Sequence, residues 1–466
     1  MSVYRLFDRA YRGHVHDSEV LRNLNIIILA AAVGMLLATA QGGVAFTGYA
    51  STLGAGEFAF GLISALPVLA SLLQIPVSYL AVKTGKYKRM FMIGGVIQRL
   101  TWVVVAFIPY MFPVGQSRIW SLIVLVTLAA MAGSFVVIPS VTLLGSMVPI
   151  DIRGRFIAAR QKVCTAVSLV IGLGIAFSLD YLPGFTGYTL VFMAGGIAGI
   201  VEILMYKRIN FSGIPGKPEG FSITKGIKDC FKTPKTRNYF IYWTLWCFAI
   251  YLNAPFITKY AIDVISISYT NMIIFGAIVS QVMMFITVSR WGVFLDRYGS
   301  VPLMLIATVS TTIVISVWLF AVPGSVWPVF VFNLLGGMVW SGHDACMVNM
   351  QFSHTPSEGR PAALAVFAVF TSIAAATALI IGGAVLELLS PVMERANLTF
   401  AGTPFDHYKL LFVIAIVLRL TVTAVFLPRV WNEKDMTLRE AYTKLYNDSS
   451  ARLKYSYSRI RIPRRK

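Results

Sequence analysis

The chain has 466 residues and a formal net charge of +20, from 40 Lys and Arg against 20 Asp and Glu. Hydrophobic residues make up 57% of it and charged residues only 13%, whereas a soluble domain usually carries about a quarter charged residues. The composition therefore excludes an ordinary soluble domain and predicts a membrane protein.

Apolar runs follow one another along the whole chain, and each is long enough to cross a bilayer. A spanning helix needs roughly 20 apolar residues, and hydrophobicity that is continuous rather than alternating predicts helices and not barrel strands. The twelve predicted spans are residues 24–49, 57–82, 89–110, 119–147, 157–180, 187–207, 238–262, 271–295, 301–322, 327–352, 361–388 and 408–428. We therefore expect an all-α membrane protein with twelve transmembrane helices.

Basic residues are concentrated between the spans on one side. With the N-terminus inside, the outer segments contain only Arg118, Lys259, Arg395 and Lys409. This asymmetry predicts that both termini are cytoplasmic, in a multi-pass protein of the cell (inner) membrane. Because membrane topology accounts for the placement of the basic residues, the high net charge does not indicate nucleic-acid binding. We expect the basic tail either to contact anionic lipid head groups or to be simply solvated.

The spans divide into two groups of six. The predicted organisation is a cytoplasmic N-terminal segment (1–23), a first six-helix bundle (24–207), a central loop (208–237), a second bundle (238–428) and a basic tail (429–466). Within the central loop, residues 223–231 favour a short amphipathic surface helix. The halves also contain similar segments: Pro149 to Arg153 matches Pro356 to Arg360, and 78–85 matches 292–299. Internal repeats of this kind are common in transporters.

The second pair of segments carries a family resemblance. Gly292, Asp296, Arg297 and Gly299, after the eighth span, resemble the signature loop of the major facilitator superfamily, and Lys83-Thr-Gly85 resembles a degenerate copy. The resemblance covers all twelve spans. It implies two pseudo-symmetric six-helix bundles around a central cavity, which spans 1, 4, 7 and 10 line, and transport by alternating access.

The resemblance also implies a cytoplasmic gate. Asp296 would meet the N-terminus of the fifth span, where free N–H groups favour an anion, beside Arg153 and Arg155. Alternatively, Asp296 and Arg297 only turn a tight loop. Val82 stands where the first-half copy should be acidic, so we expect a one-sided latch. The candidate gate residues are Gly292, Asp296, Arg297, Gly299, Lys83, Gly85, Arg153, Arg155 and Arg360.

Ionisable side chains inside spans are costly and need an explanation. Asp344 and its neighbour His343 lie in the tenth span, and we expect Asp344 to exchange a proton during transport. The alternative is a buried Asp that is hydrogen-bonded to another helix. Successive helical positions point about 100° apart, so the two side chains should not both face the cavity. For Arg99 and Arg419, a structural role in pairing within a bundle is favoured over substrate contact. Glu202 is also expected to be structural, because it lies close enough to the cytoplasmic end of its span to snorkel.

Uncharged side chains complete the candidate cavity. On the expected cavity helices they are Gln41, Tyr49, Tyr251, Asn253 and Trp340, and on the flanking helices Gln74 and Gln281. Aromatic faces and amides would suit a sugar, an aromatic metabolite or a drug, although packing alone also explains each aromatic residue. Asp180, Asp263 and Glu387 lie near the outer ends of their spans, and we expect no special role for them.

These observations predict a secondary active transporter of a small organic solute, coupled to protons, and not an enzyme. The alternatives are an exporter of amphipathic compounds and, in another class, a membrane sensor, a scaffold or a lipid flippase. No phosphate-cradling loop or metal-ligand spacing occurs, so we expect neither a cofactor nor a metal. We expect a monomer, with a small-molecule substrate and membrane lipids as its partners.

Overall fold

The computed structural model describes residues 18–209, 231–355, 360–400 and 402–430, with Glu440 and Thr443. Most of the expected N-terminal segment, the central loop with nearly all of its amphipathic helix, and the basic tail lie outside these residues.

The first half is entirely helical where it is described. Its helices are α2 (Ser18–Ala40), α3 (Gly43–Thr52), α4 (Glu57–Ala70), η3 (Ser71–Leu73), α5 (Gln74–Thr84), α6 (Tyr87–Ala106), α7 (Ile108–Met111), α8 (Gln116–Met147), η4 (Ile150–Ile152), α9 (Arg153–Tyr181) and α10 (Thr186–Tyr206). Glycine ends α5, because Gly85 adopts a left-handed φ of 65°, a conformation that costs glycine little.

The second half repeats this plan. Its elements are α12 (Pro234–Tyr251), α13 (Ala254–Asp263), α14 (Tyr269–Asn271), the π-helical η5 (Met272–Ile278), α15 (Val279–Tyr298), α16 (Ser300–Ser316), η6 (Val317–Phe320), α17 (Trp327–His354), α18 (Arg360–Ala396), a hairpin of β1 (Thr399–Phe400) and β2 (Thr403–Pro404), α19 (His407–Phe426) and η7 (Leu427–Val430). Gly299 ends α15 with a φ of 87°. The two matched loop segments of the sequence thus both end on a glycine with positive φ.

Among the described residues, eleven helical segments are long and apolar enough to cross a membrane. The tenth expected span is α17, which has 28 residues but is interrupted by Asn333, His343 and Asp344. These polar side chains lower its hydropathy. Polar residues in a spanning helix typically face the interior of the bundle or a water-filled cavity.

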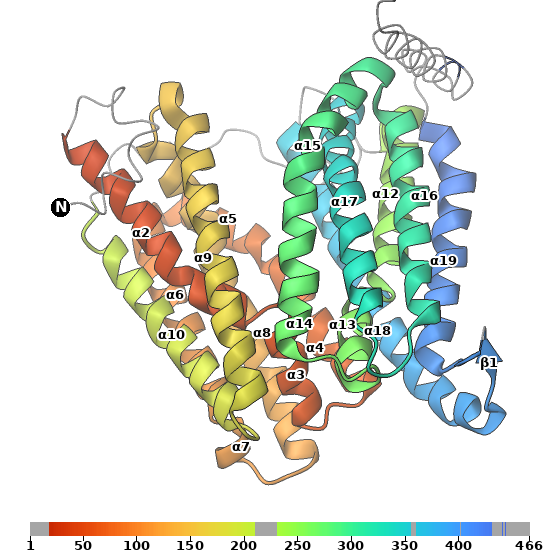
Figure 1. The fold of residues 1–466 in the computed structure, drawn as a ribbon. Helices are drawn as coiled ribbons and strands as arrows, with labels where there is room; N and C mark the ends of the chain where they lie inside the picture. The colour runs from red at the N-terminus through yellow and green to blue at the C-terminus, as the bar shows by residue number, and fades with distance from the viewer. Residues whose placement is uncertain are drawn as a thin grey trace, which may run out of the picture.

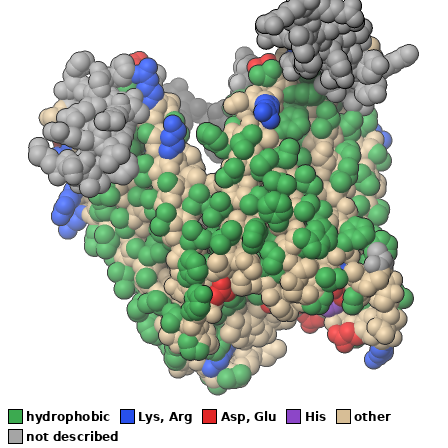
Figure 2. All heavy atoms as spheres, in the orientation of Figure 1, with side chains coloured by type: hydrophobic (Ala, Val, Ile, Leu, Met, Phe, Trp, Pro, Cys, Tyr) green, Lys and Arg blue, Asp and Glu red, His purple; other side chains and the backbone are tan. Residues whose placement is uncertain are grey.

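The helices form two bundles that meet at one end and separate at the other (Figure 1). We call the end that carries Lys83, Arg89 and Arg153 the basic face, and the other end the opposite face. Figure 2 shows the surface hollowed between the bundles at the basic face, and apolar side chains over the flanks of both bundles.

Core packing follows the same division. Two buried clusters cross between the halves. The larger lies toward the opposite face, where the rings of Phe60 and Phe256 are 5.9 Å apart, and the smaller joins Ala65 to Ala376 and Leu379. The clusters around Phe156 and Phe91, and the one around Trp243, are each confined to one half. The bundles are therefore packed together toward one membrane surface only.

A close approach of the two halves joins α4 to α18. A Cβ added to Gly383 would lie 2.6 Å from the Glu57 carbonyl oxygen and 3.2 Å from the Gly61 Cα atom. The two backbones are thus in contact, and glycine is required at this crossing.

Candidate functional site

The first spanning helix of each half is broken. In the first half the break falls at Gln41 and Gly42, between α2 and α3, and Gly43 has a φ of 59°. In the second half it falls at Leu252 and Asn253, between α12 and α13. Discontinuous spanning helices leave backbone groups near the mid-membrane, which is where transporters build substrate sites.

A cavity of about 480 Å³ lies beside the first break, with residues of both halves in its wall. Its polar side chains are Gln41, Thr47, Ser64, Gln98 and Thr258, and its aromatic ones are Phe46, Phe60 and Trp102. No Asp, Glu, Lys, Arg or His lines it in the described part of the chain. We call it the central cavity. Amides, hydroxyls and aromatic faces suit a small neutral organic molecule.

Local contacts hold the walls of the central cavity. Trp102 stacks on Phe192, with ring centroids 5.5 Å apart, and meets the edge of Phe46 at 5.7 Å. The Thr47 hydroxyl donates to the Gly43 carbonyl at 2.8 Å. The oxygen of that hydroxyl still has capacity to accept a hydrogen bond from a ligand.

A charged pair lies next to the central cavity, inside the first bundle. Arg99 Nη2 lies 2.8 Å from Glu202 Oε2, and Arg99 Nη1 donates to Gln98 Oε1 at 2.6 Å. The pair borders a polar chamber of about 190 Å³, which shares Gln41 and Gln98 with the central cavity. Arg99 and Glu202 are thus paired within one bundle, and Arg99 orients an amide of the cavity wall.

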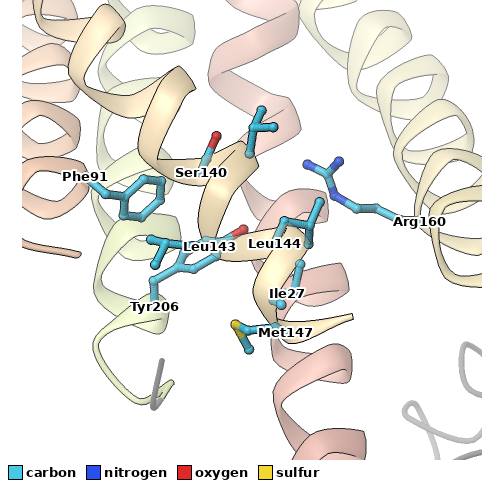
Figure 3. A pocket seen from close by; sticks show the side chains of 9 residues that line it. Ile27, Phe91, Ser140, Leu143, Leu144, Met147, Arg160 and Tyr206 are labelled. Atoms are coloured by element: carbon cyan, nitrogen blue, oxygen red, sulfur yellow. The ribbon is translucent and has the colours of Figure 1, made fainter. Parts of the chain in front are cut away.

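Arg160 separates this chamber from a smaller one of about 120 Å³ toward the basic face. Figure 3 shows its guanidinium pointing from α9 toward α8 and Leu144, with Tyr206 and Ser140 in the same pocket. The central cavity shares Gln41 and Gln98 with the chamber of about 190 Å³, and that chamber shares Arg160 with the smaller one. A row of polar side chains therefore extends from the central cavity toward the basic face.

Arg419 has no carboxylate partner among the described residues. Its guanidinium is buried and donates to the carbonyls of Ala249 and Ile250, each at 3.3 Å, and to Asn253 Oδ1 at 2.9 Å. The break after α12 frees these carbonyls from helical hydrogen bonds, and the guanidinium satisfies them. Asn253 is fully buried in this contact and does not reach the cavity.

His343 and Asp344 differ in exposure, although their side chains are in contact. His343 is buried, and Trp246 Nε1 donates to its Nε2 at 2.9 Å, while the rings of Trp243 and Trp340 flank it at 5.7 and 4.8 Å. Because Nε2 accepts this bond, the neutral ring carries its proton on Nδ1, which faces Asp344 Oδ1 at 3.3 Å. The Asp344 side chain is 56% exposed. Of the two side chains, only that of Asp344 is exposed.

Other expected cavity residues are dispersed. Tyr49 is fully buried, and its hydroxyl donates to the Val105 carbonyl at 2.6 Å, so it belongs to the core of the first bundle and not to a cavity. Gln74 lines a separate hollow of about 270 Å³ between α5 and α18. Tyr251 is 40% exposed, and Trp340 and Gln281 are half-buried outside the central cavity.

The expected gate residues at the basic face are apart in this conformation. Asp296 is exposed, with no hydrogen bond or ion pair to another described residue, and a Cβ at Gly292 would meet open space. Arg153 donates to the Gly145 carbonyl at 3.0 Å, at the end of α8. Arg155, Arg297 and Lys83 are exposed, and the Arg360 side chain lies outside the described part.

The opposite face is closed by polar contacts between the halves. Lys259 Nζ lies 3.2 Å from Glu57 Oε1 and 2.6 Å from Asp263 Oδ2. Tyr408 donates to Glu57 Oε1 at 2.6 Å, and Ser51 to Asp263 Oδ2 at 2.9 Å. In the described ranges, every hydrogen bond and ion pair that joins the halves lies at this face.

Asp180 adds a second kind of contact there. It lies at the end of α9, and its carboxylate accepts from the backbone N–H groups of Tyr269 and Thr270 at 2.9 and 2.8 Å. The carboxylate of one half thus caps the first turn of a helix in the other. The expectation that Asp180, Asp263 and Glu387 have no special role is wrong, because each carboxylate bonds the other half. Glu387 Oε2 accepts from the Phe58 N–H at 2.9 Å.

Of the polar and aromatic side chains that line the central cavity, only Gln41 was predicted from the sequence. Gln98, Trp102 and Ser64 lie on spans 3 and 2, which the family plan does not place among the main cavity helices. The available signal was the Gly42-Gly43 pair within an apolar run, since glycine pairs favour a break.

Comparison with known proteins agrees with this architecture. Solved structures of other membrane transporters share this fold. The chain shares 14% identity and a TM-score of 0.68 with a mutant of the nucleoside transporter NupG, covering 88% of this chain and 100% of that one. It shares 14% and 0.64 with an inward-facing, unoccupied bacterial homologue of the human lysosomal transporter Spinster, covering 90% and 100%. It shares 14% and 0.62 with a D-xylose-proton symporter, covering 88% and 99%.

No curated protein sequence matches the chain. The sequence model of the Major Facilitator Superfamily matches residues 27–289, more than half of the chain. The chain is a membrane transporter rather than an enzyme, and it belongs to the Major Facilitator Superfamily.

Proposed function

We propose that this transporter carries a small neutral organic solute by alternating access, with the central cavity as its binding site. The observation that carries the proposal is the cavity itself, which residues of both halves line beside a broken spanning helix. A site between two bundles is exposed to each side in turn as the bundles rock. The basic face is cytoplasmic by the positive-inside rule, so this conformation is open to the cytoplasm.

The lining favours a hydroxylated or heterocyclic substrate. Amide and hydroxyl groups recognise hydroxyls and ring nitrogens, while Phe46 and Trp102 offer flat apolar faces. A charged substrate has no counter-charge in the described wall of this cavity. Nucleosides and sugars meet these requirements, and the solved transporters of similar fold include a nucleoside transporter and a D-xylose-proton symporter.

The cavity is tested by ligand-dependent thermal stability. Purified protein is screened against nucleosides, sugars and amphipathic drugs, and a ligand at 100 times its dissociation constant raises the unfolding free energy by about 2.7 kcal/mol. Gln98→Leu should remove the shift. Gln74→Leu is the matched control, because Gln74 lines a different hollow. Hits only among amphipathic drugs, unaffected by Gln98→Leu, would favour an exporter instead and overturn the proposed site.

Asp344 is the proposed proton carrier. Its carboxylate is exposed on α17, whereas His343 is buried and its Nε2 accepts a hydrogen bond from Trp246. A carboxylate that meets water in one conformation and a dry interior in the other binds and releases a proton once per cycle.

Proteoliposome transport separates this role from a structural one. Asp344→Asn should abolish uptake driven by a proton gradient and leave substrate exchange intact, because exchange requires no net proton movement. His343→Gln serves as the comparison and should lower stability more than coupling. If Asp344→Asn also abolishes exchange in well-folded protein, or leaves gradient-driven uptake unchanged, the carrier role is refuted.

A further inference from the structure

A groove of about 490 Å³ runs along the outer surface of the first bundle. It is formed by α5, α6 and α8, and no described residue of the second half lines it. Its walls are apolar and open to the surroundings, since Ile93, Ile97 and Leu128 are 50%, 44% and 45% exposed. In a membrane, a groove in this position is open to lipid.

The length of the groove matches one leaflet. Along α6 it extends from Arg89 to Ile97, and eight residues at 1.5 Å each span about 12 Å. Half of a hydrocarbon core of about 30 Å is about 15 Å. The groove therefore extends from the basic face roughly to the middle of the bilayer, as one acyl chain does.

Two exposed cations lie at the end of the groove near the basic face. Lys86 and Arg89 are exposed, and neither side chain has a hydrogen bond or ion pair with another described residue. Lys88, between them, turns away and donates to the carbonyls of Lys207 and Ile209 at 3.1 and 2.8 Å. No Asp or Glu lines the groove in the described part. The end of the groove near the basic face therefore offers positive charge to an anion, and the remainder of the groove is apolar.

We propose that this groove is a binding site for an anionic phospholipid of the leaflet at the basic face. Lys86 and Arg89 bind the head-group phosphate and its additional negative charge, and one acyl chain lies along Ile93 and Ile97. Charge complementarity selects an anionic head group over a zwitterionic one, and the apolar walls select a lipid over a free phosphate ion. The proposal does not depend on the transported substrate.

Native mass spectrometry of the full-length protein tests the site. The probes are phosphatidylglycerol and phosphatidylcholine with the same oleoyl chains. Phosphatidylglycerol should bind more tightly, and the Lys86→Gln/Arg89→Gln variant should bind it about 30-fold more weakly, at about tenfold per 1.4 kcal/mol and about 1 kcal/mol per basic residue. The matched control is Lys207→Gln/Arg208→Gln, which removes two exposed charges from the same face outside the groove.

A second variant tests the trough without changing charge. Ile93→Trp fills a lipid-exposed part of the groove and should also weaken binding of phosphatidylglycerol. Equal binding of the two lipids, full retention by Lys86→Gln/Arg89→Gln, or an equal loss in the control variant would each overturn the proposal. The last result would mean that surface charge in general, and not this groove, attracts the lipid.

Discussion

The two faces of the molecule differ in how the halves meet. At the opposite face, side chains of one half bond directly to the other, and a large core cluster crosses between them. At the basic face each half has its own cluster, and Asp296 is exposed with no described partner. Contacts that lie on only one face stabilise one conformation. Transport requires that these contacts break while contacts at the other face form. The conformational equilibrium thus depends on a small set of polar residues.

Asp180 and Asp296 occupy related places in this comparison. Asp180 lies at the end of α9 and caps the first turn of the spanning helix that begins at Tyr269. Asp296 lies near the end of that same spanning helix, at the basic face. We propose that in the alternative conformation Asp296 caps the first turn of α9, so that each helix holds the other at one face.

Lys259→Met should have the largest effect on this asymmetry. It leaves Glu57 and Asp263 without their shared cation in a largely buried site, and breaking a buried pair costs about 3–5 kcal/mol. We expect a lower melting temperature and longer distances between spin labels at Val114 and Leu398, on a background without the four native cysteines.

Lys409→Met is the control for this change. Lys409 is also buried near the opposite face, but it bonds Thr403 and Pro404 within its own half. It should lower stability without separating the labels. If both variants give the same label distances, the Lys259 contacts do not hold the halves together.

Asp180→Asn should have a smaller effect of the same sign. Loss of a charged cap costs about 0.5–1 kcal/mol, which changes a conformational ratio by up to about fivefold. The longer Val114–Leu398 distances should gain population, and less so at high salt, because Asp180 is exposed and its charge is screened. An unchanged distribution at low salt would show that the cap does not contribute.

Asp296→Ala should have the smallest effect on the conformation described here, because it removes no contact with a described residue. If the carboxylate latches the other conformation, its loss should shift the population further toward opening at the basic face. Spin labels at Ile157 and Val293 on α9 and α15 report that opening. No change in labelling or accessibility at either face would exclude the latch.

The general plan was predictable from local features. Apolar runs of spanning length predicted the all-α membrane fold, and the matched loop segments predicted two related halves. α17 is the expected span that is not apolar enough to be recognised by hydropathy. One of the polar residues that lower its hydropathy is Asp344, whose side chain is exposed. Helical geometry predicted that His343 and Asp344 would not both face the cavity; the structure buries His343 and exposes Asp344.

The candidate site was harder to predict. Tyr49 and Asn253 are polar residues on expected cavity helices, yet both are buried, bonded to Val105 and Arg419. Gln98 lines the cavity from the third span, which is not one of the four spans that the family resemblance implies for the cavity wall. A hydropathy pattern does not predict which polar residues are buried and which line the cavity. This depends on which side chain forms a hydrogen bond with which backbone or polar group far away in the chain.

By itself the sequence determined that the chain spans the membrane many times, that its positive charge lies on one side, and that its halves are related. Each of these properties can be read from residues that are close together in the chain. The free energy of transfer into lipid and the placement of charge both depend on local composition. Only the tertiary structure decided which face is closed, which residues line the central cavity, and that Asp180 and Lys259 join the halves. Those properties arise from contacts between residues far apart in the chain, whose geometry local composition does not specify.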